Sequence, residues 1–289
     1  MFLYFVIDRF SEILSDTTCN LGYLEIKMQL MKALEKAWDN DRYVRLFTDD
    51  GKTLGSIDND ECKIDLLTQA WAALSGACPQ EKAECAVKTA SALIDKSTGI
   101  IKLFAPPLID TKDIGYITSY PAGVRENGGQ YTHATIWYIA ALFALNHPDT
   151  AYKLLEMINP IVHGQNEGET YRVEPYVLSA DVYAGKFGGR GGWTWYTGGA
   201  SWLYVTILEN LVGLKRRGNR LILNPNPPAA ISKIQIHYRY EHGVVSITVD
   251  NTETAGTWSV IVDGIRYNTN EITLTKTLAN KTISLRRQR

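Results

Sequence analysis

The strongest constraint on the fold is a change of hydrophobic period near residue 216. Before this point, apolar residues recur at helical spacing, which predicts helices with a buried face. These segments are residues 24–38, 64–74, 83–94, 133–145, 150–157 and 200–211. After it, short stretches alternate apolar and polar residues, are rich in β-branched side chains and are separated by turn signals such as Asp263-Gly264, a pattern typical of antiparallel strands. We therefore predict a mainly α chain with a C-terminal β module, divided into residues 1–215 and 216–289.

The predicted strands are short, and the predicted helices are joined by long loops. The strands cover residues 221–223, 234–238, 244–249, 258–262, 272–274 and 283–285. The loops are rich in Gly, Pro and Asn and cover residues 49–59, 104–130, 159–174 and 184–198. Since helices hold such loops in place, we expect the loops to carry the chemistry.

Charge and hydropathy exclude two classes of partner. The formal net charge is -1, with 30 basic and 31 acidic side chains, so the chain has no basic face for nucleic acid phosphates. The apolar opening, residues 1–7, is interrupted by Asp8 and Arg9 and is too short to span a membrane. We interpret it as the buried face of a helix and predict neither a nucleic acid nor a membrane partner.

The cysteines favour a reducing compartment. No two of the four form a CxxC pair, which argues against a zinc site and against a disulfide framework. They are Cys19, Cys62, Cys78 and Cys85. We predict a cytoplasmic protein without a metal.

A glycine-rich segment runs directly into a predicted helix. It covers residues 120–133, with the sequence YPAGVRENGGQYTH. Gly128 and Gly129 allow a close backbone approach or a positive φ, and His133 lies where the free N–H groups of a helix start favour an anion. A histidine in this place can also be purely structural. We predict that His133, which has Arg125 nearby in the sequence, belongs to an anion-binding site, with the structural role as the alternative.

A second glycine-rich loop also ends at a predicted helix. It covers residues 188–200, with the sequence GGRGGWTWYTGGA. Thr197 is suited to cap the helix and, with the N–H of Gly198, to hold a phosphate oxygen; a capped helix behind a tight turn is the alternative. No Walker-type lysine follows, which excludes a nucleotide P-loop. The aromatic side chains of this loop are of a kind that stacks on sugars.

Together these segments resemble family 94 glycoside phosphorylases. The resemblance rests on YPAGVRENGGQYTH, on EPYV with ADVY close behind it, and on GRGGWTWYTGGASW. The upstream stretches DNDRYVRLFTDDGKTLGS and DECKIDLLTQAWAALSG are similar too, so the likeness covers about residues 38–240. It is strongest to the phosphorylase domain at the end of cyclic β-1,2-glucan synthases and weaker to cellobiose and chitobiose phosphorylases.

The resemblance implies a fold and a reaction. The fold is an (α/α)6 barrel followed by a small antiparallel β-sheet domain. The reaction is reversible phosphorolysis of a β-glucoside with inversion, which gives α-glucose 1-phosphate, with inorganic phosphate as co-substrate and no cofactor. An inverting glycosidase uses a carboxylate to activate water. Because phosphate is already a nucleophile, neutral or cationic donors that hold it in line are enough.

The resemblance also implies roles for single residues. His133 matches the phosphate-binding histidine of the family, and Thr197 with Gly198 matches its phosphate-binding threonine–glycine pair. Tyr120 and Arg125 match residues that line the acceptor-sugar subsite. The neighbouring Glu126 belongs to the same motif but receives no role.

The general acid of the family is absent from the matched segments. It is an aspartate in a Gly-Asp-Trp-Asn-Asp motif, expected upstream of Met1. Residues 38–41, Trp-Asp-Asn-Asp, look similar, but the RYVRLFTDDG that follows them matches a later family segment. We therefore predict an incomplete barrel that is inactive alone and needs a polypeptide carrying the N-terminal half of the barrel.

Two alternatives to a split phosphorylase remain. One is a non-catalytic remnant that binds carbohydrate or phosphate. The other is a β-glucan hydrolase, which needs two suitably spaced carboxylates. The candidate carboxylates are Asp60, Glu61, Asp65, Glu126 and Glu174.

Overall fold

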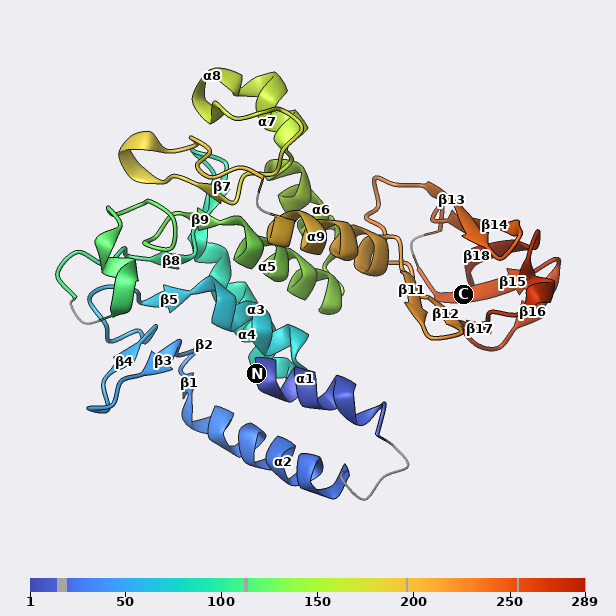
Figure 1. Ribbon diagram of the computed structural model, residues 1–289, viewed down its shortest axis with the longest axis horizontal. Coiled ribbons are helices and arrows are strands. Elements are labelled where there is room, and N and C mark those ends of the chain that lie inside the picture. The colour runs from blue at the N-terminus through green and yellow to red at the C-terminus, as the bar shows by residue number, and fades with distance from the viewer. Residues whose placement is uncertain (15–19, 112–113, 196, 254, 289) are drawn as a thin grey trace. The chain divides into compact units, whose positions relative to one another are not determined.

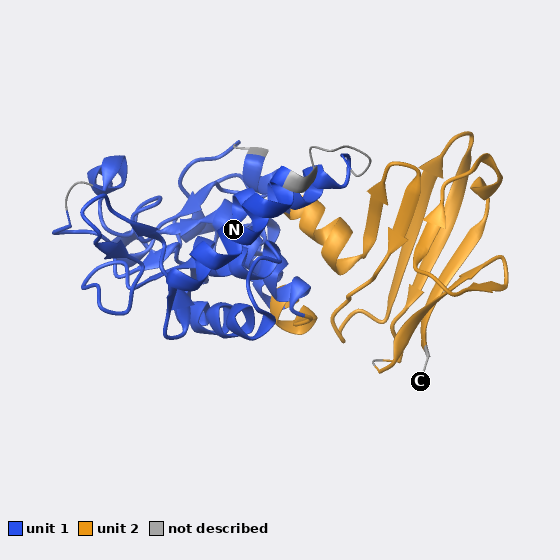
Figure 2. Ribbon diagram, turned by 90° about the horizontal axis from the view of Figure 1, so that it is seen from below, with its two compact units in different colours: residues 1–145, 153–202 blue, residues 146–152, 203–289 orange. Residues whose placement is uncertain are grey.

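The computed structural model describes residues 1–14, 20–111, 114–195, 197–253 and 255–288, with the backbone alone at residues 20, 21, 197 and 288. The chain divides into two compact units, residues 1–145 with 153–202 and residues 146–152 with 203–289 (Figure 2). Helices dominate the first unit and strands the second, which confirms a helical part followed by a β module. The boundary at residue 216 stays a prediction.

Each segment predicted to be helical contains a helix (Figure 1). The α-helices of the described residues are α1 (Phe2–Ser11), α2 (Asn20–Lys36), α3 (Leu66–Leu74), α4 (Gln80–Ala90), α5 (Thr132–Ala144), α6 (Pro148–Met157), α7 (Pro160–Asn166), α8 (Gly168–Tyr171) and α9 (Thr197–Val205). A π-helical turn, η4 (Thr206–Leu211), follows α9. The closed (α/α)6 barrel stays a proposal.

Helix α5 lies at the centre of the first unit. Its sequence is apolar on nearly every side, and such a helix is expected inside a protein. It packs against α3, which in turn packs against α4. The hydroxyl of Tyr138 in α5 donates to the carbonyl of Val87 in α4 at 3.0 Å, so this buried phenol has a partner. This packing fixes the first turn of α5, where His133 lies.

The start of α3 is held by a buried carboxylate. Asp65 accepts hydrogen bonds from the backbone N–H and the hydroxyl of Thr68, both at 2.9 Å, as an N-cap residue does. It also forms an ion pair with Arg45. Asp65 is therefore fully used by the fold.

Short antiparallel ladders tie the loops of the first unit together. They are β1 (Trp38–Asp39) with β2 (Arg42–Tyr43), β3 (Leu46–Phe47) with β4 (Thr53–Leu54), β5 (Ile64–Asp65) with β8 (Phe104–Ala105), β6 (Ile94–Asp95) with β7 (Ile100–Ile101), and β9 (Gln130–Tyr131) with β10 (Asp181–Val182). The β9–β10 pair joins two loops that carry the sequence motifs. Two-residue strands are too short to show alternation, so the sequence pattern does not predict them.

The β module contains a five-stranded and a three-stranded sheet. Their strand orders are β13-β14-β18-β15-β16 and β11-β12-β17. The bounds are β11 (Leu214–Arg217), β12 (Arg220–Leu223), β13 (Lys233–Tyr240), β14 (Gly243–Asp250), β15 (Thr257–Val262), β16 (Ile265–Tyr267), β17 (Glu271–Thr273) and β18 (Thr282–Gln288). Apolar residues from both sheets form one core.

The prediction of an antiparallel sheet is wrong for one strand pair. Strands β14 and β18 pair in parallel. Between them the chain passes through β15 and β16 and then through β17 of the other sheet, so β18 returns beside β14 in the same direction. Alternation of side chains shows which face of a strand is buried, but not which strand becomes its neighbour.

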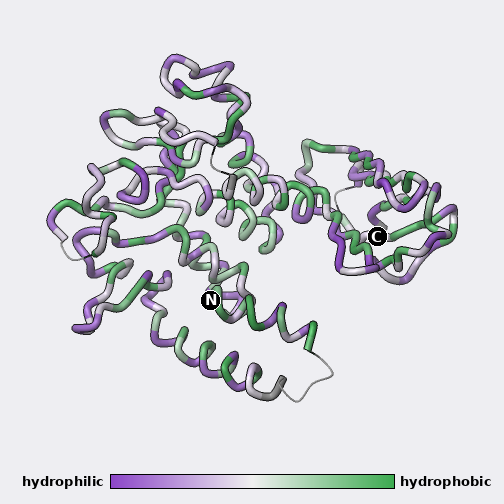
Figure 3. Tube along the Cα trace, in the orientation of Figure 1, coloured by the Kyte–Doolittle hydropathy of each residue, from purple (hydrophilic) through white to green (hydrophobic). Residues whose placement is uncertain are grey.

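The N-terminal helix forms as expected, but most of its apolar face is exposed. Within α1 only Ile7 is buried, whereas Phe2 is 56% exposed. Figure 3 shows apolar stretches along α1 and α2, which pack against each other. The predicted burial of residues 1–7 is therefore wrong for most of them, because the described helices cover only part of this face.

Candidate functional site

His133 lies at the second position of α5 and is half-buried. Its ring lies beside two indoles, with centroid distances of 4.3 Å to Trp137 and 6.2 Å to Trp202. Its Nε2 has no hydrogen-bond partner among the described residues, and burial lowers the pKa of the imidazole. The ring therefore keeps unused hydrogen-bonding capacity at a helix start, where an anion is favoured.

The start of α9 lies next to this histidine. A Cβ atom built on Gly198 would lie 3.4 Å from Nδ1 of His133, and one built on Gly199 would lie 3.9 Å from its backbone nitrogen. The structure thus brings His133 and Gly198 together, although 64 residues separate them in the sequence. The side chain of Thr197 lies outside the described residues, and the phosphate-binding role of all three residues stays a prediction.

Arg125 lies between two aromatic rings. Its guanidinium carbon is 5.1 Å from the ring centre of Tyr120 and 4.7 Å from that of Trp193, distances at which a cation is attracted by an aromatic ring. Its Nε has no hydrogen-bond partner among the described residues. The structure therefore joins the two glycine-rich loops through Arg125 and Trp193.

Glu126 is a buried carboxylate next to Arg125. Its Oε1 accepts a hydrogen bond from the hydroxyl of Tyr116 at 3.3 Å, and its Oε2 lies 3.5 Å from the Nε of Arg125. Within the described part of the chain, Oε2 accepts no hydrogen bond. Glu126 and Arg125 therefore form a buried ion pair between neighbouring residues of the site.

Asp181 is the site residue that the sequence reasoning missed. It is 1% exposed, and its Oδ1 accepts the backbone N–H of Trp193 at 3.0 Å. Its Oδ2 has no hydrogen-bond partner among the described residues. Burial raises the pKa of this carboxyl, while the nearby charge of Arg125 opposes the rise. The sequence signal that could have indicated Asp181 is the ADVY segment, which contains it. This segment supported the family resemblance, but none of its residues was assigned a role.

We expect Gly192→Ala to disturb the site through Asp181. A Cβ at this position would lie 2.5 Å from both carboxylate oxygens, so the carboxylate must move and its bond to the Trp193 N–H breaks. Loss of a buried hydrogen bond costs about 1 to 3 kcal/mol, measured as the free energy of unfolding in urea. In the control Gly168→Ala, the new Cβ meets no atom within 4 Å. Equal stability of the two variants would contradict the prediction.

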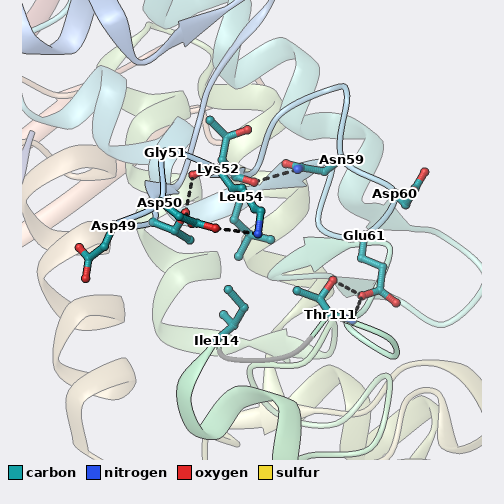
Figure 4. A pocket seen from close by; sticks show the side chains of 12 residues that line it. Asp49, Asp50, Gly51, Lys52, Leu54, Asn59, Asp60, Glu61, Thr111 and Ile114 are labelled. Atoms are coloured by element: carbon teal, nitrogen blue, oxygen red, sulfur yellow. Dashed lines mark hydrogen bonds and ion pairs between the residues drawn. The ribbon is translucent and has the colours of Figure 1, made fainter.

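A wide cavity of the first unit lies beside the β3–β4 hairpin. It has a volume of about 870 Å³ and is lined by several acids, including Asp49, Asp50, Asp60 and Glu61. Figure 4 shows Glu61 turned toward Thr111 and the side chain of Asp60 directed away from Glu61. Two carboxylates placed in this way do not face a common substrate bond.

Several candidate carboxylates of the hydrolase alternative serve the fold. Glu61 accepts the backbone N–H groups of residues 109, 110 and 111 at 2.8 to 2.9 Å. Burial opposes its ionisation, but the hydrogen bonds from Thr111 and these amides outweigh burial and lower the pKa of Glu61 to about 2, so it stays ionised. Glu174 accepts the indole N–H of Trp195 at 3.0 Å. Neither is suited to donate a proton.

The acids of the Trp-Asp-Asn-Asp string also have local roles. Asp39 accepts the hydroxyl of Ser56 at 2.8 Å and the N–H of Ile57 at 2.9 Å. Asp41 accepts from Arg42 at 2.7 Å. These contacts anchor a loop and a strand.

Two further kinds of feature concern metal ions and membranes. The described residues contain no group of three or more His, Cys, Asp or Glu side chains that could hold a metal ion. Among the helices formed by these residues, none is both long and apolar enough to cross a membrane.

Comparison with known proteins decides the family. The sequence model of the glycosyl hydrolase 94 superfamily catalytic domain matches residues 1–213. The chain belongs to glycosyl hydrolase family 94. The match covers every residue of the site described above.

The similar family 94 proteins include a glucan synthase and phosphorylases. The chain is 48% identical over 206 residues to the cyclic beta-(1,2)-glucan synthase NdvB of Rhizobium meliloti, covering 69% of this chain and 7% of that protein. It is 29% identical to the N,N'-diacetylchitobiose phosphorylase of Vibrio furnissii, covering 78% and 29%. It is 26% identical to the 1,2-beta-oligoglucan phosphorylase of Listeria innocua, covering 48% and 14%. The chain therefore spans less than a third of the length of these three relatives.

Proposed function

We propose that this chain forms the phosphate-binding and acceptor-binding parts of an inverting phosphorylase that converts β-1,2-glucan oligosaccharides to α-glucose 1-phosphate. Membership of family 94 supports phosphorolysis, and the similarity to a cyclic β-1,2-glucan synthase and a 1,2-β-oligoglucan phosphorylase supports the linkage. The observation that carries the proposal is the meeting of His133 with the start of α9.

In this proposal the two helix starts hold inorganic phosphate. The Nδ1 of His133, which lies beside Gly198, binds its oxygens together with the N–H of Gly198 and the hydroxyl of Thr197. Phosphate attacks the anomeric carbon without help from a base, so orientation and neutralisation of its charge are the work of the protein. The fixed positions of α5 and α9 provide that orientation.

In this proposal, residues of the same two loops bind the acceptor sugar. Tyr120 and Trp193 flank the guanidinium of Arg125, and aromatic rings beside a charged pair suit the apolar face and the hydroxyls of a sugar. Asp181 acts as a positioning residue, because its carboxylate holds the backbone of Trp193.

The proton for the leaving oxygen comes, in this proposal, from an aspartate on another stretch of polypeptide. Described carboxylates such as Asp65 and Glu61 are engaged by the fold. The same polypeptide would cover the exposed apolar side chains of α1 and α2, which include Phe2, Phe10, Leu24 and Met28. A cytoplasmic location fits the free thiols of Cys62, Cys78 and Cys85, since cytosolic proteins rarely carry disulfides.

We expect the isolated chain to show no phosphorolysis. Incubation with β-1,2-gluco-oligosaccharides, with and without phosphate, followed by assay of glucose 1-phosphate and free sugar, tests this directly. Phosphate-dependent release of glucose 1-phosphate by the chain alone would place the general acid among its own carboxylates. Release of free sugar without phosphate would instead support the hydrolase alternative.

The same assay separates the proposal from the non-catalytic alternative. A polypeptide that carries the upstream helices and a Gly-Asp-Trp-Asn-Asp motif is added to the chain. Restored phosphorolysis supports the split enzyme, whereas binding of phosphate and oligosaccharide without turnover supports a binding remnant.

A further inference from the structure

The β module contains a polar cavity of its own. It has a volume of about 640 Å³ and lies among β15, β16, the loop between β16 and β17, and the end of β12. The lining side chains with hydrogen-bonding or stacking capacity include Asn224, Trp258, Arg266, Tyr267, Asn268 and Asn270. All of them belong to residues 203–289, so the cavity is a property of this unit alone.

The loop that bears the amides has a fixed backbone. It joins β16, which pairs with β15 in the five-stranded sheet, to β17, which pairs with β12 in the other sheet. The carbonyl of Asn270 accepts the N–H of Leu223 at 2.9 Å, and the hydroxyl of Thr269 accepts the N–H of Glu271 at 3.1 Å. Because the backbone of this loop is held at both ends, ligand binding would cost little backbone entropy.

The free amides point to a ligand with many hydroxyl groups. Asn224, Asn268 and Asn270 are exposed and, within the described part of the chain, make no side-chain hydrogen bond. Each amide offers donors and an acceptor, which matches adjacent hydroxyls that both donate and accept. The lining residues include no Asp or Glu, so a divalent cation has no carboxylate ligand there.

Aromatic rings complete the cavity. Tyr267 is 42% exposed and presents a ring of the kind that packs on an apolar sugar face. The Trp258 ring is half-buried, with the guanidinium carbon of Arg287 4.5 Å from its centre. Nearby, Ser259 is 4% exposed, and its Oγ has no hydrogen-bond partner among the described residues.

We propose that this cavity is a second saccharide-binding site, which holds a stretch of glucan chain on the β module. The amides, one arginine and the exposed ring of Tyr267 recognise a neutral sugar chain. The inference rests on the proposed function only for the identity of the sugar, a β-1,2-linked glucan. The site needs neither phosphate nor the general acid.

The test is oligosaccharide binding by the full chain carrying Trp193→Ala, which weakens the acceptor site of the first unit. Isothermal titration calorimetry with β-1,2-gluco-oligosaccharides should still detect binding in this background. Adding Tyr267→Ala, or Asn268→Ala with Asn270→Ala, should weaken it at least tenfold. Tyr267→Phe keeps the ring and should retain binding. Ile265→Ala, on the same strand, 68% exposed and outside the cavity lining, should have no effect.

The outcomes separate this inference from the proposed function. The second site would be overturned by unchanged oligosaccharide binding in two variants, Tyr267→Ala and the double variant Asn268→Ala with Asn270→Ala. This conclusion requires that both variants unfold thermally like the parent. Tyr267-dependent binding of a differently linked glucan in place of the β-1,2-linked one would support the second site and count against the proposed substrate. Circular dichroism shows whether each variant is folded, and Tyr267→Phe supplies the comparison if Tyr267→Ala is not.

Discussion

Replacing His133 by alanine should raise the dissociation constant for phosphate about 10- to 150-fold and leave that for the oligosaccharide nearly unchanged. A hydrogen bond to a charged group contributes roughly 1.5 to 3 kcal/mol, and each 1.4 kcal/mol corresponds to a factor of about ten. The Nδ1 of His133 lies beside Gly198 at the start of α9. Its removal therefore affects the anion directly. Titration calorimetry of the chain, alone and combined with the upstream polypeptide, gives both constants.

The matched variant is Arg125→Ala. Because Arg125 lies between Tyr120 and Trp193, the substitution should weaken oligosaccharide binding more than phosphate binding. The two substitutions should thus give opposite patterns. If His133→Ala lost affinity equally for phosphate and for the oligosaccharide, His133 would serve the fold and would not bind the anion.

Gly213→Ala should destabilise the β module by about 2 to 5 kcal/mol. The backbone of Gly213 has a φ of +76°, and a left-handed conformation costs an alanine about 1 to 2 kcal/mol. The new Cβ would also overlap the main chain at Asn224 and Pro225, and such overpacking adds about 1 to 3 kcal/mol. The carbonyl of Gly213 accepts the N–H of Asn224 at 2.8 Å, so the displaced segment loses this bond too. Urea unfolding followed by far-ultraviolet circular dichroism measures the change.

Gly218→Ala separates backbone strain from the overlap. Gly218 has a φ of +58°, but a Cβ there meets no atom within 4 Å. Gly218→Ala should therefore reduce the free energy of unfolding only by the cost of backbone strain, about 1 to 2 kcal/mol. If the two variants were equally stable, the overlap at Gly213 would be relieved without cost, and the packing described around Asn224 would be wrong.

The parts of the fold that could be predicted are those with long periodic segments. Helix α5 is apolar nearly all round, and strands β13 and β14 alternate over eight residues each, so local spacing alone indicates their type. The two-residue ladders of the first unit depend on contacts between distant loops, and no local period marks them. The exposure of α1 depends on which surfaces surround it, which hydropathy along the chain does not encode.

In the candidate site, too, residues marked by a local sequence pattern could be predicted, and residues placed by contacts between distant segments could not. His133 and Gly198 could be proposed because each lies at a helix start preceded by glycines. Asp181 could not, because its role arises from the β9–β10 pairing that buries its carboxylate beside Arg125 and the Trp193 N–H. In the sequence it is one acidic residue among 31. A buried carboxylate is recognised by its partners, and those come from other segments of the chain.

Phosphorus-31 NMR can test whether this chain is the phosphate-binding part of a phosphorylase. The sample contains this chain, the upstream polypeptide, β-1,2-gluco-oligosaccharides and inorganic phosphate. We expect the phosphate signal to decline while α-glucose 1-phosphate appears, and we expect no such product from either polypeptide alone. We also expect His133→Ala in this chain to slow the conversion at low phosphate and high phosphate to restore it. Formation of free glucose with no loss of phosphate, or full conversion by a mixture in which His133→Ala has no effect, would contradict the assignment of this chain as the phosphate-binding part of a phosphorylase.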